Sequence, residues 1–331
     1  PDRATYYFDG YATSPDGRTI AAIHNISDEY LNVEIHRDWE QITSARTPLP
    51  ENMGGRYISM GVNNEGYTAL LTSQDEGTKG TRPRASNDPL LVIMDPEGSV
   101  LFTHEFDRAE HDLTTADLYV EDGRLLGVIG LRSLSDWNTD GFLVFQYDMD
   151  RKELIQEDIW MATEIRSVEE RGSHNWMHID DIVRTEGGYW VFAEGFRPTA
   201  NSDGDAIHNF RGNVVLRLNE DFKVTSQTYV HKHQEYLGPY GRTHGGARYF
   251  FNDEAVGIFY TALHRGKAQL DEKNHLYYVV VDSDGETEKT LVRAMERKEV
   301  PLCYLWPLGS GRFLAIAEER RGNLYLGRLE F

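Results

Sequence analysis

Residues 172–194 read GSHNWMHIDDIVRTEGGYWVFAE. The second half of this stretch is typical of two β-strands joined by a tight turn at Gly187, because glycine supplies the positive φ that such a turn requires. The first half is a polar segment that contains His174, Trp176 and His178. The hairpin half recurs along the chain and the polar half does not, which predicts a repeated scaffold with one site built on it.

The hairpin pattern occurs six times, at intervals of roughly 50–70 residues, and such a fixed-scale repeat of strands predicts a propeller. The turns are marked by Gly17, Gly66, Gly123, Gly187, Glu254 and Gly311. A third and a fourth strand follow most hairpins, as at residues 90–94 and 100–103. Four antiparallel strands per unit and six units predict an all-β fold, a six-bladed β-propeller that forms a single domain over residues 1–331.

The last repeat ends one strand early, after residues 324–329. The opening run, residues 3–8, is rich in strand-forming side chains and would supply the missing strand, so that the ring of blades is closed by the N-terminal strand. The alternative is that residues 4–11 simply form the innermost strand of the first blade.

The longer connections are predicted to lie on one face. Within the repeats they are residues 72–88, 131–140, 195–211 and 263–274, and between repeats residues 167–177 and 231–245. In a propeller both classes of loop lie at the same end of the blades, so we expect a ligand site there. A short helical turn fits only residues 156–171.

Two of the segments between repeats carry the candidate site. We expect His178, His244 and Tyr240 to be catalytic, and Arg242, His174, Trp176 and His208 to bind substrate. Histidine suits proton transfer near neutral pH, and arginine suits a carboxylate or phosphate group. The alternative for any single histidine is a structural role, bridging backbones or capping a turn.

Metal and cofactor sites are not expected. His174 and His178 have the spacing of a zinc motif, but no general-base glutamate lies between them and the segment continues into a strand. Asn201, Asp203 and Asp205 place oxygen ligands at alternate positions, like part of a calcium loop. The glycine position and the missing glutamate favour a solvated acidic loop instead.

Two further predictions concern charged residues in strands. Asp180 and Asp181 are adjacent in a predicted strand, so their side chains are expected on opposite faces. Residues 231–233, His-Lys-His, are expected at the end of an outermost strand, on the outer rim.

Composition excludes several classes of partner. The net charge is −20, from 54 acidic and 34 basic residues, which disfavours nucleic acid and anionic membranes. Cys303 is the single cysteine, in an apolar setting typical of a buried, inert thiol. No apolar run reaches the ~18 residues that a membrane helix needs. The chain begins at Pro1 without methionine, as a trimmed or processed chain would.

Residues 176–185, with residues 193–197 after them, resemble the uncharacterised six-bladed β-propeller proteins of bacterial exported and surface systems. The resemblance implies a propeller in a periplasmic, cell-surface or secreted location and carries no assigned activity. More distantly, the His–Tyr–Arg set is similar to that of propeller polysaccharide lyases. In those enzymes a histidine or tyrosine removes the proton beside a uronate carboxylate, which an arginine neutralises.

Two functions therefore remain open. The first is an exported binding or scaffold module whose long-loop face holds a glycan, a peptide or a protein. The second is a carbohydrate-active enzyme, a polysaccharide lyase acting on an acidic glycan. Whether the protein is an enzyme at all is left undecided by the sequence, since fold does not fix function.

Overall fold

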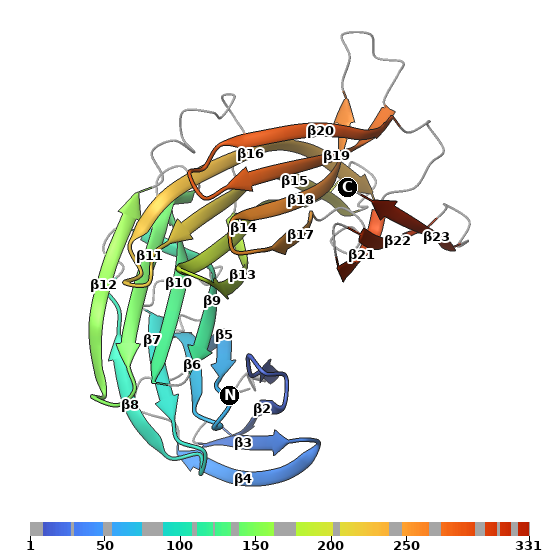
Figure 1. Ribbon diagram of the computed structural model, residues 1–331. Helices are drawn as coiled ribbons and strands as arrows, with labels where there is room; N and C mark the ends of the chain where they lie inside the picture. The colour runs from blue at the N-terminus through green and yellow to red at the C-terminus, as the bar shows by residue number, and fades with distance from the viewer. Residues whose placement is uncertain are drawn as a thin grey trace. The chain divides into compact units, whose positions relative to one another are not determined.

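The computed structural model describes residues 9–27, 30–48, 55–74, 89–107, 111–121, 123–133, 139–161, 177–200, 206–237, 247–264, 273–294, 302–309, 312–318 and 324–330. These ranges contain β-strands and no α-helix (Figure 1). A helix long and apolar enough to cross a membrane is accordingly not found among them. The chain divides into two compact units, Pro1–Gly172 (unit 1) and Ser173–Phe331 (unit 2).

Unit 1 contains three four-stranded sheets, each built from consecutive strands in spatial order. Sheet 1 has β1 (Asp9–Thr13), β2 (Thr19–Ser27), β3 (Tyr30–Arg37) and β4 (Glu40–Pro48). Sheet 2 has β5 (Gly55–Val62), β6 (Thr68–Gln74), β7 (Pro89–Met94) and β8 (Val100–Glu105). Sheet 3 has β9 (His111–Glu121), β10 (Arg124–Ser133), β11 (Thr139–Asp148) and β12 (Glu153–Met161).

Unit 2 continues the pattern. Sheet 4 has β13 (Met177–Thr185), β14 (Gly188–Ala200), β15 (Ala206–Leu218) and β16 (Val224–Leu237). Sheet 5 has β17 (Arg248–Phe251), β18 (Ala255–His264), β19 (Lys273–Asp282) and β20 (Thr287–Ala294). Sheet 6 has three strands, β21 (Leu302–Gly309), β22 (Arg312–Glu318) and β23 (Leu324–Glu330).

The protein is therefore all-β, with five four-stranded antiparallel sheets and one three-stranded sheet, an arrangement consistent with a β-propeller. The predicted hairpin turns are confirmed for the first five repeats, because β1–β2, β5–β6, β9–β10, β13–β14 and β17–β18 all pair across them. The sixth turn residue, Gly311, lies outside the described residues. Cys303 lies on β21, and its predicted burial concerns a side chain outside the described part.

The core forms between neighbouring sheets of each unit. On β3, Leu31, Val33 and Ile35 are buried at alternate positions, as expected of a strand with one face in the core. Every residue of β7 is buried, because this strand is covered on both faces. In unit 1 the first strands of the three sheets lie next to one another, β5 beside both β1 and β9.

The same two kinds of hydrogen bond join one pair of neighbouring sheets in each unit, sheets 1 and 2 in unit 1 and sheets 4 and 5 in unit 2. A backbone N–H in one sheet's first turn donates to a side chain in the next sheet's first turn: Asp16 to Asn64 Oδ1 (3.2 Å) in unit 1, and Glu186 to Asp253 Oδ1 (2.7 Å) in unit 2.

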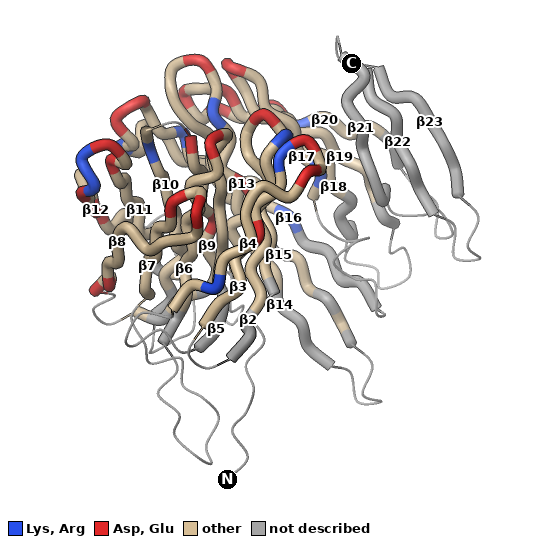
Figure 2. The backbone as a smooth tube through the Cα atoms, turned by 90° about the horizontal axis from the view of Figure 1, so that it is seen from below, with Lys and Arg blue, Asp and Glu red and all other residues tan. Residues whose placement is uncertain are grey.

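The second bond joins an outermost strand to the glycine of the next sheet's last turn. Thr47 Oγ1 donates to the Gly98 carbonyl (2.5 Å), and Thr228 Oγ1 donates to the Gly285 carbonyl (2.7 Å). The tight turns of neighbouring sheets thus lie at one end of each unit. Figure 2 shows that acidic residues gather at the bends that connect these strands.

Several predicted loops prove to be strands. Most of the predicted loop 195–211 is the extended hairpin of β14 and β15, in which Phe196 pairs with Phe210 and their rings lie 5.1 Å apart. Residues 231–237 of the predicted loop 231–245 belong to β16, and the remainder lies outside the described residues. The proposed helical turn at 156–171 is wrong as far as Met161, which ends β12, and its remainder lies outside the described residues.

We predict that the close approach at Gly98 is specific to the contact between sheets 1 and 2. Gly98 has φ +83°, and an added Cβ would lie 2.6 Å from the Ala45 Cβ. Gly17 has φ +71° with no atom within 4 Å of an added Cβ. Gly98→Ala should lower the free energy of unfolding by about 2–4 kcal/mol, and Gly17→Ala by about 1–2 kcal/mol.

Chemical denaturation of both variants measures this difference. Gly17→Ala is the matched control, since it carries the left-handed backbone without the contact. Equal losses in the two variants would show that the approach of Gly98 to Ala45 places no constraint on the fold.

Candidate functional site

The structure describes only part of the predicted site. His178 lies on β13 and is half-buried. His208 lies on the paired strand β15 rather than in a loop, opposite Pro198 of β14, and its side chain is outside the described part. Outside the described residues lie His174, Trp176, Tyr240, Arg242 and His244, and also Asn201, Asp203 and Asp205.

A β-bulge in β13 brings two carboxylates to one face. Ile179 pairs with Ala193 and Asp181 pairs with Phe192, so Asp180 is an extra residue. Side chains along a strand point alternately to its two faces, and the extra residue of a bulge interrupts this alternation, so two successive side chains can point to the same face. Ile179 and Ile182, which flank the two aspartates, are buried on one face, and the half-buried Asp180 and Asp181 share the other, so the prediction that they point to opposite faces is wrong.

The same face carries a polar cluster, defined as His178, Asp180, Asp181, Glu194, Asn213 and Lys232. Directly paired residues of antiparallel strands share a face. His178 pairs with Glu194 of β14, and Glu194 pairs with Asn213 of β15. The cluster lies on the same face of sheet 4 as Trp190, Phe192 and Val215, directly beyond them along the strands. These three residues belong to the core between sheets 4 and 5.

The centre of the cluster is a buried ion pair. Lys232 Nζ donates to Glu194 Oε1 at 2.5 Å, and the Lys232 side chain is 0% exposed. The same oxygen accepts the backbone N–H of Ala247, immediately before β17, at 2.9 Å. Glu194 thus ties β16 and the start of sheet 5 to β14. The prediction that residues 231–233 form an outer rim is wrong for Lys232.

The surroundings of Lys232 both oppose and support a positive charge on its ammonium group. Burial lowers the pKa of Lys232, and the carboxylate of Glu194 opposes that shift. Aromatic rings add weaker support, with Lys232 Nζ 4.9 Å from the Phe210 ring centroid and 6.0 Å from that of Tyr260. The lysine therefore depends on Glu194 to remain charged in this position.

Asp181 is the carboxylate whose ionisation is disfavoured. Burial raises the pKa of Asp181, and a hydrogen bond from the Ile182 backbone N–H opposes the shift. Around it, Asp180 favours and Arg248 disfavours the charged form of Lys232, so both lie within electrostatic range of the ion pair. Carboxylic groups with raised pKa values can donate protons as well as accept hydrogen bonds.

Asn213 marks an incompletely satisfied position in the cluster. It is 0% exposed, and neither its amide nitrogen nor its amide oxygen has a hydrogen-bond partner in the described structure. Buried amides in folded proteins are nearly always paired with protein, water or ligand. The position next to Glu194 is therefore suited to a water molecule or a ligand group that forms hydrogen bonds with Asn213.

The sequence contained one signal for this cluster that the prediction did not use. Thr228 and Val230 are buried at alternate positions of β16, and Lys232 follows at the same spacing. Continuing the alternation places the lysine in the core. The described residues contain no group of three or more potential metal ligands.

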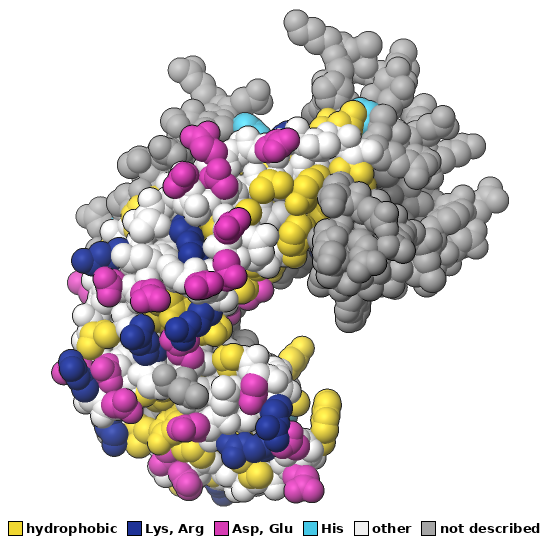
Figure 3. Space-filling model, viewed as in Figure 1, with side chains coloured by type: hydrophobic (Ala, Val, Ile, Leu, Met, Phe, Trp, Pro, Cys, Tyr) yellow, Lys and Arg dark blue, Asp and Glu magenta, His cyan; other side chains and the backbone are white. Residues whose placement is uncertain are grey.

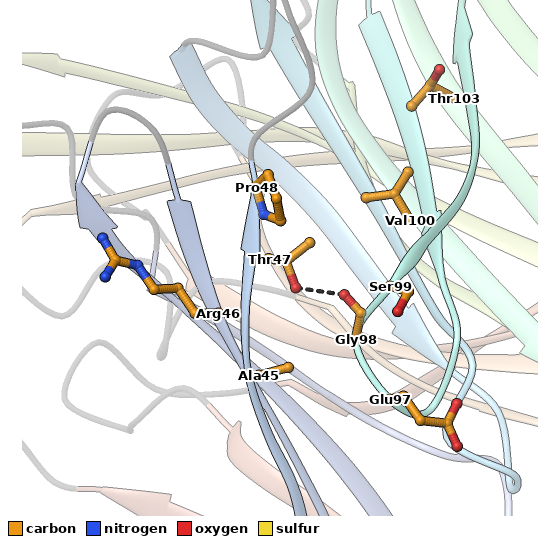
Figure 4. A pocket seen from close by; sticks show the side chains of 9 residues that line it. All are labelled: Ala45, Arg46, Thr47, Pro48, Glu97, Gly98, Ser99, Val100 and Thr103. Atoms are coloured by element: carbon orange, nitrogen blue, oxygen red, sulfur yellow. Dashed lines mark hydrogen bonds between the residues drawn. The ribbon is translucent and has the colours of Figure 1, made fainter.

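Apart from the polar cluster, an open pocket lies between sheets 1 and 2, with a volume of about 430 Å³ (Figure 4). Its lining comes from β4 and from the turn and strand of β8, and the Thr47–Gly98 hydrogen bond crosses it. Arg46 and Glu97 are the charged side chains of the lining. The pocket coincides with the repeated junction between sheets, which favours a structural origin.

Comparison with known proteins leaves the family open. No family model matches the chain, and no curated protein matches it. The resemblance to uncharacterised exported propellers is therefore not supported by any family evidence.

Solved structures show distant similarity. Dihydro-heme d1 dehydrogenase NirN matches with 12% identity and TM-score 0.45, over 100% of this chain and 57% of that chain. A Penicillium chrysogenum alpha-L-arabinanase, complexed with arabinobiose, matches with 11% identity and TM-score 0.44, over 98% and 93%. A B. megaterium levansucrase matches with 9% identity and TM-score 0.38, over 88% and 86%. The chain spans little more than half of NirN, and nothing about its function follows from similarities this weak.

We predict strong coupling between Glu194 and Lys232. Lys232→Met or Glu194→Gln leaves one buried charge without its partner and should each lower the free energy of unfolding by about 3–5 kcal/mol. The double variant Glu194→Gln/Lys232→Met buries no charge and keeps an acceptor for Ala247 N–H. Its loss should be well below the sum of the single losses.

Urea denaturation of the four proteins gives the coupling free energy directly. Additive losses would show that the two side chains are not an ion pair in solution.

Proposed function

We propose that this protein is an exported β-propeller binding module whose ligand site is centred on the polar cluster. The six sheets would be the blades of one domain over residues 1–331, with residues 3–8 as the missing strand of sheet 6. The strand order within every sheet and the repeated hydrogen bonds at the sheet junctions support this arrangement. Seven sheets in a crystal structure, or residues 3–8 away from β23, would contradict it.

The observation that carries the proposal is the position of the polar cluster. The tight turn of β13 and β14 lies at the Thr185–Gly188 pair, whereas His178 lies near the opposite end of β13. Its partner Glu194 and the ion-paired Lys232 lie at the same level of the longer strands β14 and β16, which continue beyond them. Arg248 lies at the first position of β17, at the end opposite the β17–β18 turn. Ionisable groups gathered at the end of an otherwise apolar interface are the usual sign of a site.

The chemistry of the cluster suits a polar ligand of low net charge. Three carboxylates lie with two cations, Lys232 and Arg248, so neither sign dominates. Carboxylate, amide and imidazole groups together offer donors and acceptors for hydroxyl and amide groups. A glycan, a peptide or a protein segment fits these groups, and we include Trp176, His174, His208 and Arg242 among the residues that contact it.

A second candidate function is a carbohydrate-active enzyme, a polysaccharide lyase acting on an acidic glycan. One observation favours it: burial raises the pKa of Asp181 beside His178, which gives a proton donor and a base on one face. His178, His244 and Tyr240 would then be the catalytic groups. Release of unsaturated products from uronate-containing polysaccharides, lost in His178→Ala, is the readout, and no turnover on any of them would exclude the lyase.

We predict that Asp181→Asn weakens ligand binding about 10- to 100-fold, as expected for loss of a hydrogen bond to a charged group. Asparagine keeps the shape and the acceptor for Ile182 N–H, so stability should be preserved. The measurement is retention on arrays of glycans and peptides, followed by calorimetry on the compounds retained.

The matched control is Asp221→Asn, the same chemical change at an exposed residue in the turn between β15 and β16. It should bind as the wild type does. Equal affinity of all three proteins, or no retention of the wild type on either array, would refute a ligand site at the cluster. Recovery of the native protein only from the cytosolic fraction would refute export.

A further inference from the structure

Trp39 occupies a strained position at the tip of the β3–β4 hairpin. Arg37 pairs with Glu40, so the turn consists of Asp38 and Trp39 alone. Their φ values are +51° and +72°, the left-handed pair of a type I′ turn. Glycine is the usual second residue of such a turn, and a bulky aromatic residue there is unfavourable.

Packing within the chain does not offset this strain. Trp39 is 88% exposed, and no described ring or cation lies against its indole. Phe222 shows the contrast: it also has a positive φ (+63°), but it is 1% exposed and its ring lies 4.4 Å from that of Tyr189. Strained residues that contribute nothing to the core are typical of functional positions.

The turn is held rigidly although its tip is exposed. Arg18 Nε and Nη2 donate to the two carboxylate oxygens of Asp38 at 2.9 and 2.6 Å. The Asp38 backbone N–H donates to the Arg18 carbonyl at 2.9 Å. The side-chain hydrogen bonds from Arg18 keep the pKa of the Asp38 carboxyl below its usual value. The β1–β2 turn thus fixes the β3–β4 turn and the direction in which Trp39 projects.

The surroundings of the indole select the kind of ligand. Arg18 and Arg37 are balanced by Asp16, Asp38 and Glu40, and Figure 3 shows both signs interspersed over the end of unit 1 that contains β3 and β4. Neither a polyanion nor an anionic membrane is favoured by this balance. Charged residues flank Trp39 on both sides in the turn, Arg37 and Asp38 before it and Glu40 after it, whereas the centre of a stable protein interface is depleted of charge.

We propose that Trp39 is a stacking platform for a neutral pyranose residue of a glycan, at a site separate from the polar cluster. The indole face takes the apolar C–H face of the sugar ring, and the adjacent Asp38 carboxylate, held by Arg18, accepts hydrogen bonds from sugar hydroxyl groups. The Asp38 carboxylate has acceptor capacity beyond its two bonds to Arg18. The site lies in unit 1 at the end with the tight turns, so it does not depend on the function proposed for unit 2.

The test is affinity electrophoresis of the full chain in gels containing neutral polysaccharides with β-linked glucose or xylose. Trp39→Gly removes the ring and relieves the backbone strain, so this variant should be folded and at least as stable as the wild type. Its affinity should fall at least tenfold. Trp39→Tyr keeps an aromatic platform and should retain most of the retardation.

Asp221→Asn, a change at an exposed turn residue outside both sites, should be retarded as the wild type is. Equal retardation of Trp39→Gly and wild type, or no retardation of wild type in any neutral gel, would overturn the proposal. So would Trp39-dependent binding to vesicles of phosphatidylcholine and phosphatidylglycerol without binding to the gels, which would assign the indole to a membrane surface. Binding of a protein partner lost in Trp39→Gly, with no effect of glycan, would overturn it as well.

Discussion

The hydrogen bond from an outermost-strand threonine to a turn glycine is the constraint that sets the packing of sheet 1 on sheet 2 and of sheet 4 on sheet 5. It occurs as Thr47–Gly98 in unit 1 and as Thr228–Gly285 in unit 2, and in each case the donor strand belongs to the preceding sheet. Glycine is required because an added Cβ would lie 2.6 Å from Ala45 in one junction and 2.9 Å from Thr228 in the other. Apolar packing is non-directional and by itself does not fix how far one sheet is shifted along its neighbour. This bond, with the link between the first turns, selects one register for the packing.

The polar cluster shows how the same scaffold tolerates charge in its interior. Three bulges lie near the cluster, at Ile179/Asp181, Glu194/Phe196 and Arg211/Asn213. Bulges redirect side chains locally without ending the sheet, so strands β13 to β16 continue past them. The Glu194–Lys232 pair then satisfies its charges internally and binds the start of β17 as well. An apolar interface gives way to a polar one within a single sheet.

The sequence predicted the repeated hairpins well because their signals are local. An acidic residue before glycine, followed by β-branched and aromatic residues, identifies a turn and its strands within about ten residues. The bulges could not be predicted, since the extra residue Asp180 is recognisable only from the register against Phe192 and Ala193. Lys232 was misplaced for a related reason: its burial depends on Glu194, 38 positions earlier in the chain. Residue types suggested where a site would lie, whereas register decides which groups meet.

Because each sheet contains only consecutive strands, its pairings join residues close in the chain. Each sheet can therefore form as soon as it leaves the ribosome, and chain closure is a small part of its folding barrier. The newest sheet has an uncovered apolar face until the next one arrives. In sheet 2, until sheet 3 has been synthesised and packs against it, β7 is exposed on one face, although its six residues are all buried in the native state. The order of synthesis thus sets the moments at which the nascent protein is most prone to aggregate, and the acidic turns carry repulsive charge next to those faces.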